Sequence, residues 1–297
     1  MKSGLIILNK AEGISSQGAV TRVKRLTGAK KAGHTGTLDP LATGVLPILI
    51  ERGVKASEFM ITADKHYRAT LLLGITTDTE DITGTVLNEC ADVPCENEVL
   101  SVIRSFEGEY MQTPPMYSAL KVGGKKLCDL AREGKEIERQ ARAVRIFSIK
   151  ASRISDKEYA LDVHCSKGTY IRTLCADIGE KLGTGGVMKT LCRTEASGFT
   201  LEDAHTLSEL EEMSEEELSS VILPIECVFK DKKAVRLTEF YSRLAKNGVE
   251  IYLKKIGSPK LSEGEAVRMY DENGVFFALG ELRTFDDGEA IKPIRQF

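Results

Sequence analysis

The sequence contains no hydrophobic run long enough to cross a bilayer. Its apolar stretches, such as GVLPILI at residues 44–50, fall far short of the roughly 20 residues that a membrane-spanning helix needs. The first residues, MKSGLIILNKAEG, hold a short apolar run followed by a lysine and a glutamate, which is not the pattern of a signal peptide. Seven cysteines, an odd number without a repeating pattern, argue against a disulfide framework. We therefore expect a cytoplasmic protein with reduced thiols and no membrane partner.

Familiar catalytic and metal motifs are also missing. Cys90 and Cys95 have no histidine nearby, so a zinc site is not expected. The sequence lacks G-x-S-x-G, H-E-x-x-H and G-x-x-x-x-G-K-[ST], and GHTGTLDPLATG has the wrong spacing for a dinucleotide fingerprint. His164 and Cys165 are adjacent in a strand-like run, where neighbouring side chains face opposite sides, so they do not make a natural nucleophile–base pair. The chemistries that these motifs support fit the sequence badly.

The formal net charge of −3 argues against a nucleic-acid partner, but the charge is strongly segregated. Residues 1–70 carry 11 Lys and Arg against 5 Asp and Glu, and residues 121–150 carry 9 against 4. Residues 201–230 carry 1 against 9. Because binding to a polyanion depends on where positive charge lies, a basic surface with an acidic flank remains compatible with RNA or DNA. Solvated helix faces are the plainer explanation of the same pattern.

Apolar spacing and turn-forming residues predict a mixture of strands and helices. Ser15 or Ser16 can cap a helix that Gly28 ends, and Pro47 indicates an edge or a bulge in the strand that contains it. The expected strands are 4–8, 45–50, 66–74, 143–154 and 158–165; the expected helices are 52–62, 96–108, 170–183 and short pieces of 202–220; residues 113–126 are expected as an extended surface insertion.

The irregular alternation of these elements favours an α+β fold over a doubly wound sheet. The 297 residues divide at a change of composition near residue 230, which predicts a large domain over 1–230 and a small β-rich domain over 231–297. Within the small domain, Asn273-Gly274 separates two apolar runs and indicates a hairpin.

The loop GHTGTLDPLATGVLP at residues 33–47 carries a single carboxylate, Asp39. An aspartate before a proline can simply bond to its own turn, and this is the alternative explanation. The apolar residues after Asp39 indicate partial desolvation, and a desolvated carboxylate needs a cation to stay ionised at neutral pH. Arg172, in the first turn of the helix that follows SKGTY, could hold it in a two-point contact.

Two further segments offer groups that suit RNA. The SKGT stretch at residues 166–169 supplies free backbone N–H groups and Lys167 at a helix start, which suits an anion such as phosphate. Tyr67 follows Lys65 and His66 at the start of a strand, where it could stack on a base or simply pack against its neighbours.

Taken together and in this order, GHTGTLDPLATGVLP, KHYRATLLLG, TDTEDITG, PPMYSALKVGGKK with AREGKEIER, and SKGTYIRTL resemble the TruB family of tRNA pseudouridine synthases. The resemblance covers about residues 4–200. It implies a mixed, mainly antiparallel sheet of the pseudouridine synthase type and isomerisation of uridine to pseudouridine at position 55 in the T-loop of tRNA. It also implies no metal, no cofactor, no obligatory protein partner and a monomer that binds the tRNA T stem-loop.

The resemblance assigns roles to individual residues. Asp39 matches the aspartate that starts cleavage of the C1′–N1 bond, and Arg172 matches its partner. Tyr67 matches the tyrosine that stacks on the target base and is implicated in removing the C5 proton. His34 matches a histidine that enters the T-loop beside the flipped base, in line with the need to extrude a base before it reacts. The residues expected at the RNA are His34, Lys10, Lys65, Asp81, Lys125, Lys126, Lys167 and Tyr170.

The segment at about residues 108–145 is similar to an RNA-gripping insertion, and the C-terminal domain is similar in position to a PUA-type RNA-binding module. Asn9 and Ala11 replace the usual Asp and Pro around Lys10, so we expect a looser loop there. Cys192 stands where a second arginine is common, and the usual histidine before it is missing. Two alternatives remain open: a non-catalytic RNA-folding protein on the same scaffold, and a uridine-modifying enzyme with another RNA target.

Overall fold

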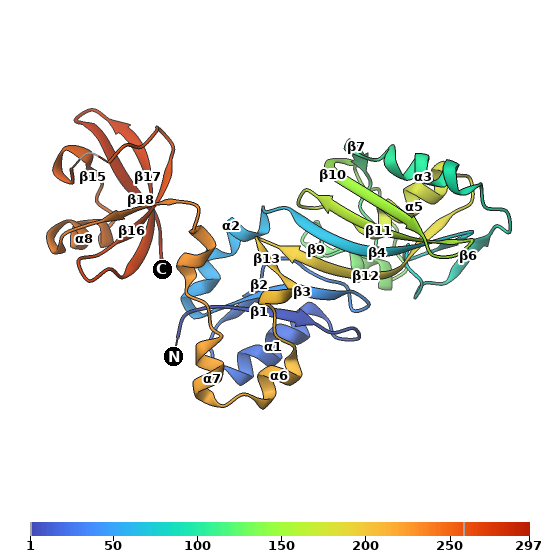
Figure 1. Cartoon of the computed structure of the whole chain (residues 1–297), viewed down its shortest axis with the longest axis horizontal. Coiled ribbons are helices and arrows are strands. Elements are labelled where there is room, and N and C mark those ends of the chain that lie inside the picture. Colours follow the sequence, from blue (N-terminus) through green and yellow to red (C-terminus); the bar gives the residue numbers. More distant parts are fainter. Residues whose placement is uncertain (1, 258) are drawn as a thin grey trace.

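The computed structural model describes residues 2–257 and 259–297, with the side chains of Lys121 and Lys126 left outside the description. A long, twisted sheet runs through the larger part of the molecule (Figure 1). Its pairings are antiparallel except for the short parallel contact of two of its strands, β3 and β12. The strands are β1 (Gly4–Lys10), β2 (Ala32–His34), β3 (Thr43–Ile50), β4 (Lys65–Leu73), β7 (Gly108–Gln112), β10 (Arg142–Arg153), β11 (Glu158–Cys165), β12 (Gly186–Ala196) and β13 (Phe199–Thr200).

Helices pack on the two ends of this sheet. The helical elements are α1 (Ser16–Leu26), η1 (Glu51–Ala56), α2 (Ser57–Ile61), α3 (Glu96–Arg104), α5 (Ile171–Lys181), η2 (Leu201–Asp203), α6 (Leu207–Glu212), α7 (Glu215–Ser220) and η3 (Ile225–Phe229). At one end α3 packs on β10 and α5 on β12 and β4, while at the other α1 and α6 lie against β1, β2 and β3. The predicted caps of α1 are confirmed, since the Ser15 side chain accepts from Gly18 N and Gly28 adopts a φ of 64°.

Helix α5 lies unusually close to the sheet. A Cβ added at Gly179 would fall 2.1 Å from the backbone nitrogen of Gly186, so a glycine is needed where the helix crosses the start of β12. This close approach fixes the axis of α5 and therefore the direction in which its first turn points.

The sequence predicted an edge or a bulge at Pro47, but the strand is internal and its pairing with β1 runs through Pro47 without a register shift. β3 pairs with β1 over residues 44–50, and its other side pairs with β12 at Thr43–Gly44 and with β2 at 48–50. Pro47 sits between those last two pairings, where its carbonyl accepts from Thr35 N and its missing N–H is not required. The strand is internal, and the proline occupies a local gap in its ladder.

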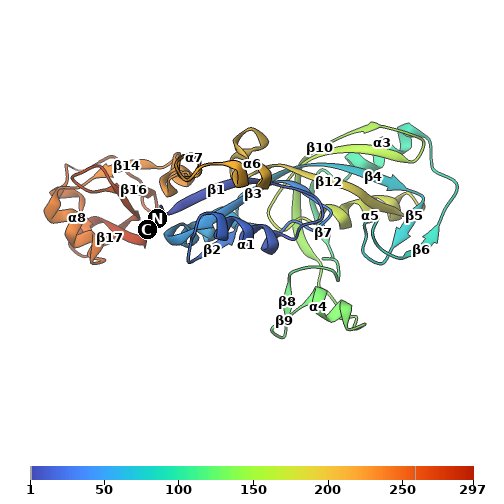
Figure 2. The ribbon, with the colours of Figure 1, turned by 90° about the horizontal axis from the view of Figure 1, so that it is seen from below.

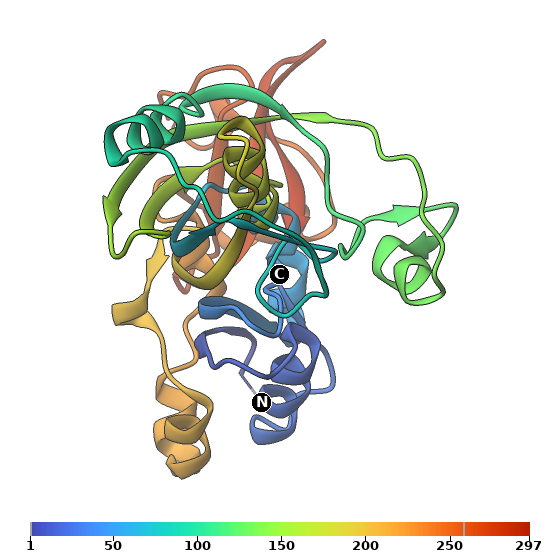
Figure 3. The same ribbon diagram turned by 90° about the vertical axis from the view of Figure 1, so that its right-hand side faces the viewer.

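The insertion is folded rather than extended as predicted. It contains a two-strand hairpin and a short helix, and it projects away from the body (Figures 2 and 3). Because β7 and the start of β10 pair in the main sheet, the projecting part is residues 113–141, narrower than the predicted 108–145. Its elements are β8 (Lys121–Val122), β9 (Lys125–Lys126) and α4 (Leu127–Arg132); a second hairpin beside α5 is formed by β5 (Ile75–Thr77) and β6 (Val86–Glu89).

The C-terminal part forms a separate sheet with its own apolar core. The predicted hairpin around Asn273-Gly274 is present between β16 and β17. Phe59, Phe229, Phe276 and Phe297 cluster where this sheet meets the larger body. The elements are β14 (Lys233–Arg236), α8 (Glu239–Lys246), β15 (Ile251–Tyr252), η4 (Leu253–Lys255), β16 (Ala266–Tyr270), β17 (Phe276–Phe285) and β18 (Gly288–Gln296).

The architecture is α+β, mainly antiparallel, with a small β-rich C-terminal part, and it confirms the predicted fold class. Over the described ranges, no helix is both long and apolar enough to cross a membrane.

Candidate active site

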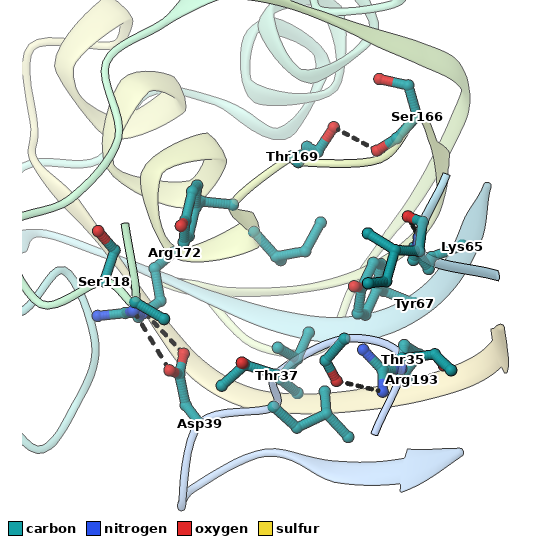
Figure 4. A pocket seen from close by; sticks show the side chains of 18 of the residues that line it. Thr35, Thr37, Asp39, Lys65, Tyr67, Ser118, Ser166, Thr169, Arg172 and Arg193 are labelled. Carbon is teal, nitrogen blue, oxygen red and sulfur yellow. Dashed lines mark hydrogen bonds and ion pairs between the residues drawn. The ribbon is translucent and has the colours of Figure 1, made fainter. Parts of the chain in front are cut away.

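The loop between β2 and β3 is held in place by the first residue of α1. The Ser16 hydroxyl donates to the Leu38 carbonyl and accepts from the Leu38 N–H, both at 2.8 Å. The Ala42 N–H donates to the Asp39 carbonyl at 3.0 Å and closes the turn. Asp39 therefore sits on a short, internally bonded loop, and its carboxylate points toward the start of α5 (Figure 4).

Arg172, in the first turn of α5, meets this carboxylate at two points. Its Nε lies 2.9 Å from Oδ2 of Asp39, and Nη2 lies 3.4 Å from Oδ1. The guanidinium also donates to the carbonyls of Thr79 at 3.1 Å and Tyr117 at 2.8 Å. The ion pair predicted from the sequence is thus present, and the arginine joins it to the β5–β6 turn and to the insertion.

Asp81 completes the surroundings of Arg172 from the β5–β6 turn. Its Oδ1 accepts from the Thr79 hydroxyl at 2.9 Å and from the N–H and hydroxyl of Thr83 at 3.0 and 2.6 Å. Its Oδ2 lies 3.9 Å from Nη1 of Arg172. The sequence placed Asp81 among the residues at the RNA, but its side chain is buried: its Oδ1 is held by the threonines of its own turn and its Oδ2 faces Arg172, so it helps to orient that arginine.

The charges around Asp39 oppose one another. Burial raises the pKa of its carboxyl, the neighbouring Arg172 lowers it, and Asp81 raises it again. The carboxylate is one-third exposed, whereas the Arg172 side chain is almost completely buried. Asp39 is therefore a partly desolvated carboxylate of raised basicity, and the fixed positive charge of Arg172 favours its ionised form.

Two adjoining pockets meet at this ion pair. The first has a volume of about 290 Å³ and runs from Asp39 and Arg172 to Tyr67, Lys65 and Arg193. The second, of about 710 Å³, opens on the other side and is lined by His34 among others. The first pocket has mostly apolar walls and a few polar groups, which is the kind of lining that suits a planar base.

Tyr67 lies in the first pocket on β4 and is nearly buried. Burial raises the pKa of its hydroxyl, and the positive charge of Arg193 is the main influence in the opposite direction. Sequence reasoning missed Arg193, which is fully buried and lines the same pocket. The sequence gives little signal for this residue, because the run 186–196 carries charged residues at several positions and shows no clear strand pattern.

Lys10 needs a correction, because the sequence placed it among the residues at the RNA. Its side chain is completely buried, and Nζ donates to the carbonyls of Ala11, Ile14 and Pro40 at 2.9, 2.8 and 3.3 Å. Burial lowers the pKa of the amine to about 8. Lys10 therefore braces the Asp39 loop from behind.

Lys65 is also nearly buried, although it borders the first pocket. Its Nζ donates to the backbone carbonyls of Ile61 and Ala63, and burial lowers its pKa to about 8. The Lys65 amine is thus bonded to the backbone at the end of α2, and little of its surface is exposed in the pocket.

The other predicted RNA-facing residues lie around the pockets. His34 is partly exposed, and its Nδ1 accepts from Gly36 N at 3.3 Å; burial lowers its pKa, which favours the neutral ring. Tyr170 lines the first pocket, and Arg142 lies 5.2 Å over its ring. Lys167 is exposed at the start of the same loop.

Lys125 and Lys126 form β9 at the tip of the insertion. The Lys125 side chain is 63% exposed and makes only a long contact, 3.9 Å, to Glu133. The Lys126 side chain lies outside the described part of the structure. In residues 2–257 and 259–297, no group of three or more His, Cys, Asp or Glu side chains is arranged to hold a metal ion.

Comparison with known proteins agrees with this geometry. The profile described as TruB family pseudouridylate synthase (N terminal domain) matches residues 24–171, and that of the tRNA pseudouridylate synthase B C-terminal domain matches residues 172–230. The chain is 46% identical to tRNA pseudouridine synthase B of Alkaliphilus oremlandii over 298 residues, covering 99% of this chain and 98% of that one. It is 42% identical to the protein of the same name from Clostridium tetani over 280 residues, covering 94% and 95%.

A solved structure shares the fold. A chain in the crystal structure of a Cbf5-Nop10-Gar1 complex superimposes with a TM-score of 0.73 at 26% identity, covering 99% of this chain and 84% of that one. The sequence profiles, the curated relatives and the shared fold agree with one another. The chain therefore belongs to the TruB family of tRNA pseudouridine synthases, isomerases that convert uridine to pseudouridine.

Proposed function

We propose that the protein isomerises uridine to pseudouridine at position 55 in the T-loop of tRNA. The observation that carries the proposal is the two-point ion pair of Asp39 and Arg172 at the mouth of a base-sized pocket that also holds Tyr67. The enzyme would act as a monomer on the T stem-loop, without an obligatory protein partner, metal or cofactor.

Asp39 would start the reaction at the ribose of the target uridine. Its raised basicity suits either of two first steps, attack on C1′ or removal of a ribose proton, and both lead to cleavage of the C1′–N1 bond. Arg172 would keep the carboxylate ionised and aimed, because its Nη2 donates to Oδ1 while its Nε lies at ion-pair distance from Oδ2, and two contacts fix the carboxylate better than one. The detached base would then rotate in the pocket and rejoin the sugar through C5.

Tyr67 would lie against the rotating base and then remove the C5 proton. Its ring forms part of the pocket wall on β4, opposite the end at which Asp39 stands. Stacking on a base contributes about 1–3 kcal/mol, which would hold the base after its bond to the sugar is broken.

The uridine must leave its stack to reach this pocket. Asp39 and Arg172 border both cavities, so a flipped nucleotide could enter through the larger one, past His34. A neutral imidazole that is partly exposed suits insertion beside the vacated position in the loop.

The RNA backbone would be gripped by the insertion and the C-terminal part. Lys125 and Lys126 lie on the projecting hairpin. Lys167 is exposed on the loop that precedes α5, between two residues that line the first pocket. We assign residues 1–230 as the catalytic domain and residues 231–297 as a PUA-like RNA-binding domain.

The experiment is a tritium-release assay with synthetic T stem-loops. One RNA carries tritium at C5 of the uridine at position 55, and a second carries it at another uridine of the loop. Release from the first RNA alone supports the proposal. Release from the second alone would assign another target, and release from neither would contradict the activity on this RNA.

A role in RNA folding could coexist with catalysis on the same scaffold. It predicts that cells with a catalytically dead variant recover part of what cells without the protein lose. Full recovery with that variant would make folding the main role.

A further inference from the structure

Arg193 carries a buried charge that no carboxylate neutralises within the part of the chain that the structure describes. Only 1% of its surface is exposed. Its Nε donates to the carbonyl of Val45 at 2.8 Å, and Nη2 donates to the carbonyl of Gly36 at 3.1 Å. Among the acidic side chains of residues 2–257 and 259–297, none comes within 4.0 Å of it as an ion-pair partner. A buried cation without a counter-ion is costly, so a group that becomes negative nearby would be strongly stabilised.

The strand register places this cation beside Tyr67. Arg193 on β12 is the direct partner of Tyr67 on β4. Both side chains enter the first pocket, and Figure 4 shows them together at the end away from Asp39. Residues paired on neighbouring strands lie close enough for their side chains to interact.

We propose that Arg193 is the counter-charge of the Tyr67 oxygen while Tyr67 removes the C5 proton. It is a positioning residue that acts through Tyr67, and this inference rests on the proposed function. Two carbonyls fix the guanidinium before the reaction, so it does not have to reorganise when Tyr67 gives its phenol proton to solvent and its oxygen becomes the anion that then accepts the C5 proton.

The proton step balances with this assignment. After the base has rejoined through C5, that carbon carries the sugar bond and a hydrogen. The C5–H pair forms the C5=C6 double bond, the C6=N1 pair moves onto N1, and N1 takes a proton from water. The C5 proton goes to the anionic oxygen of Tyr67 and then to solvent, so no oxidant or reductant is needed.

The charges that face Tyr67 leave Arg193 as the group best suited to this role. Cys165 on β11 and Asp39 on the loop both raise the pKa of the tyrosine, as does burial, and Arg193 alone among these lowers it. Lys65 borders the pocket, but its ammonium is committed to backbone carbonyls at the end of α2. Without Arg193, an anion at this oxygen would have no compensating cation among these neighbours.

The test compares two RNA substrates in variants R193Q and R193K. One T stem-loop carries tritium at C5 of the target uridine, and the other carries 5-fluorouridine there. Fluorine at C5 cannot leave as a proton, so the second substrate reports cleavage and rejoining without the Tyr67 step. The matched control is R68Q, which changes an exposed arginine that is one position from Tyr67 and faces the opposite side of β4.

We expect R193Q to slow tritium release about 100-fold. The 5-fluorouridine substrate should be rearranged within about threefold of the wild-type rate, because its chemistry ends before the proton step. The rising limb of the pH–rate profile for tritium release should move to higher pH, because losing a cation raises the pKa of the tyrosine. R68Q should match the wild type in all three measurements.

The inference would be overturned if R193Q slowed tritium release and the rearrangement of 5-fluorouridine equally. It would also be overturned if the rising limb of the pH–rate profile for tritium release stayed at the wild-type pH. If R193Q does not fold, R193K decides the question, because lysine keeps the positive charge. The ratio of tritium release to rearrangement of the 5-fluorouridine substrate should then stay near the wild-type value. A loss of tritium release alone in R193K would contradict the role of charge. No tritium release by the wild type would instead overturn the proposed function and the inference with it.

Discussion

Arg172 holds Asp39 through two separate atom pairs although 133 positions separate the residues, with Nε 2.9 Å from Oδ2 and Nη2 3.4 Å from Oδ1. The same guanidinium bonds to the carbonyls of Thr79 and Tyr117. One buried side chain therefore ties the aspartate to the β5–β6 turn and to the insertion. A conformational change of the insertion on RNA binding would act directly on the ion pair.

Replacing Arg172 by lysine should lower kcat by about 10- to 100-fold, because lysine keeps the charge but not the planar fork. Arg172 opposes the rise that burial gives to the pKa of Asp39. Weakening it raises that pKa further, so the acid limb of the pH–rate profile should move to higher pH. Single-turnover rates over a pH series measure both effects, and R68K serves as the exposed control. An R172K profile that coincides with the wild type would show that the fork is not needed.

Replacing Lys10 by methionine should loosen the Asp39 loop, since the Pro40 carbonyl loses its donor. We expect a lower kcat with little change in affinity for RNA. K24M, at an exposed position near the end of α1, is the matched control. A K10M enzyme with wild-type kcat would show that the loop does not depend on this brace.

The same variant should change how stability depends on pH. Burial lowers the pKa of Lys10 from 10.5 to about 8 in the folded protein. Between these values the unfolded chain binds more protons than the folded one, so the free energy of unfolding rises with pH in that window. Lys65 has a similarly lowered pKa and contributes in the same direction. Urea unfolding below and above about pH 8 should therefore show a smaller rise for K10M than for the wild type. Equal rises would contradict the burial of a charged Lys10.

The burial of these lysines could not be predicted from the sequence. A lysine is normally placed at the surface, because its charge is expensive to desolvate. The Lys10 amine is accommodated by three carbonyls, one of which, at Pro40, lies 30 positions away. The same reasoning failed for Arg193, whose strand carries charged residues at several positions and gives no clear apolar alternation.

The sequence was more informative about the ion pair and the main elements. Asp39 is the single carboxylate of an apolar loop, so it requires a cation to stay ionised. An arginine can contact a carboxylate at two points, and this property indicates Arg172 as the partner. The prolines, glycines and lysines of residues 113–126 predict an extended segment, but Gly123 and Gly124 have another role in the structure. Both have positive φ, at 58° and 85°, and they form the tight turn that joins β8 to β9. The two glycines therefore make the hairpin possible.

Changing Lys125 and Lys126 together to alanine should weaken RNA binding and flatten its dependence on salt. Each phosphate contact that is lost reduces the slope of log K against log salt by about 1. The Lys125–Glu133 contact is exposed and long, so its loss should hardly affect stability. The control K24A/R25A removes the same charge at the end of α1, remote from both pockets. A K125A/K126A slope equal to that of the wild type would show that the hairpin does not grip RNA.

The central claim is that the Asp39 carboxylate performs the chemistry, and D39N tests it most directly. Asparagine keeps the size of the side chain and its place in the turn, but it cannot act as a base or a nucleophile. With a T stem-loop tritiated at C5 of uridine 55, we predict that D39N releases almost no tritium while its Kd for the RNA stays within about threefold of the wild-type value. Tritium release by D39N at the wild-type rate would contradict the account.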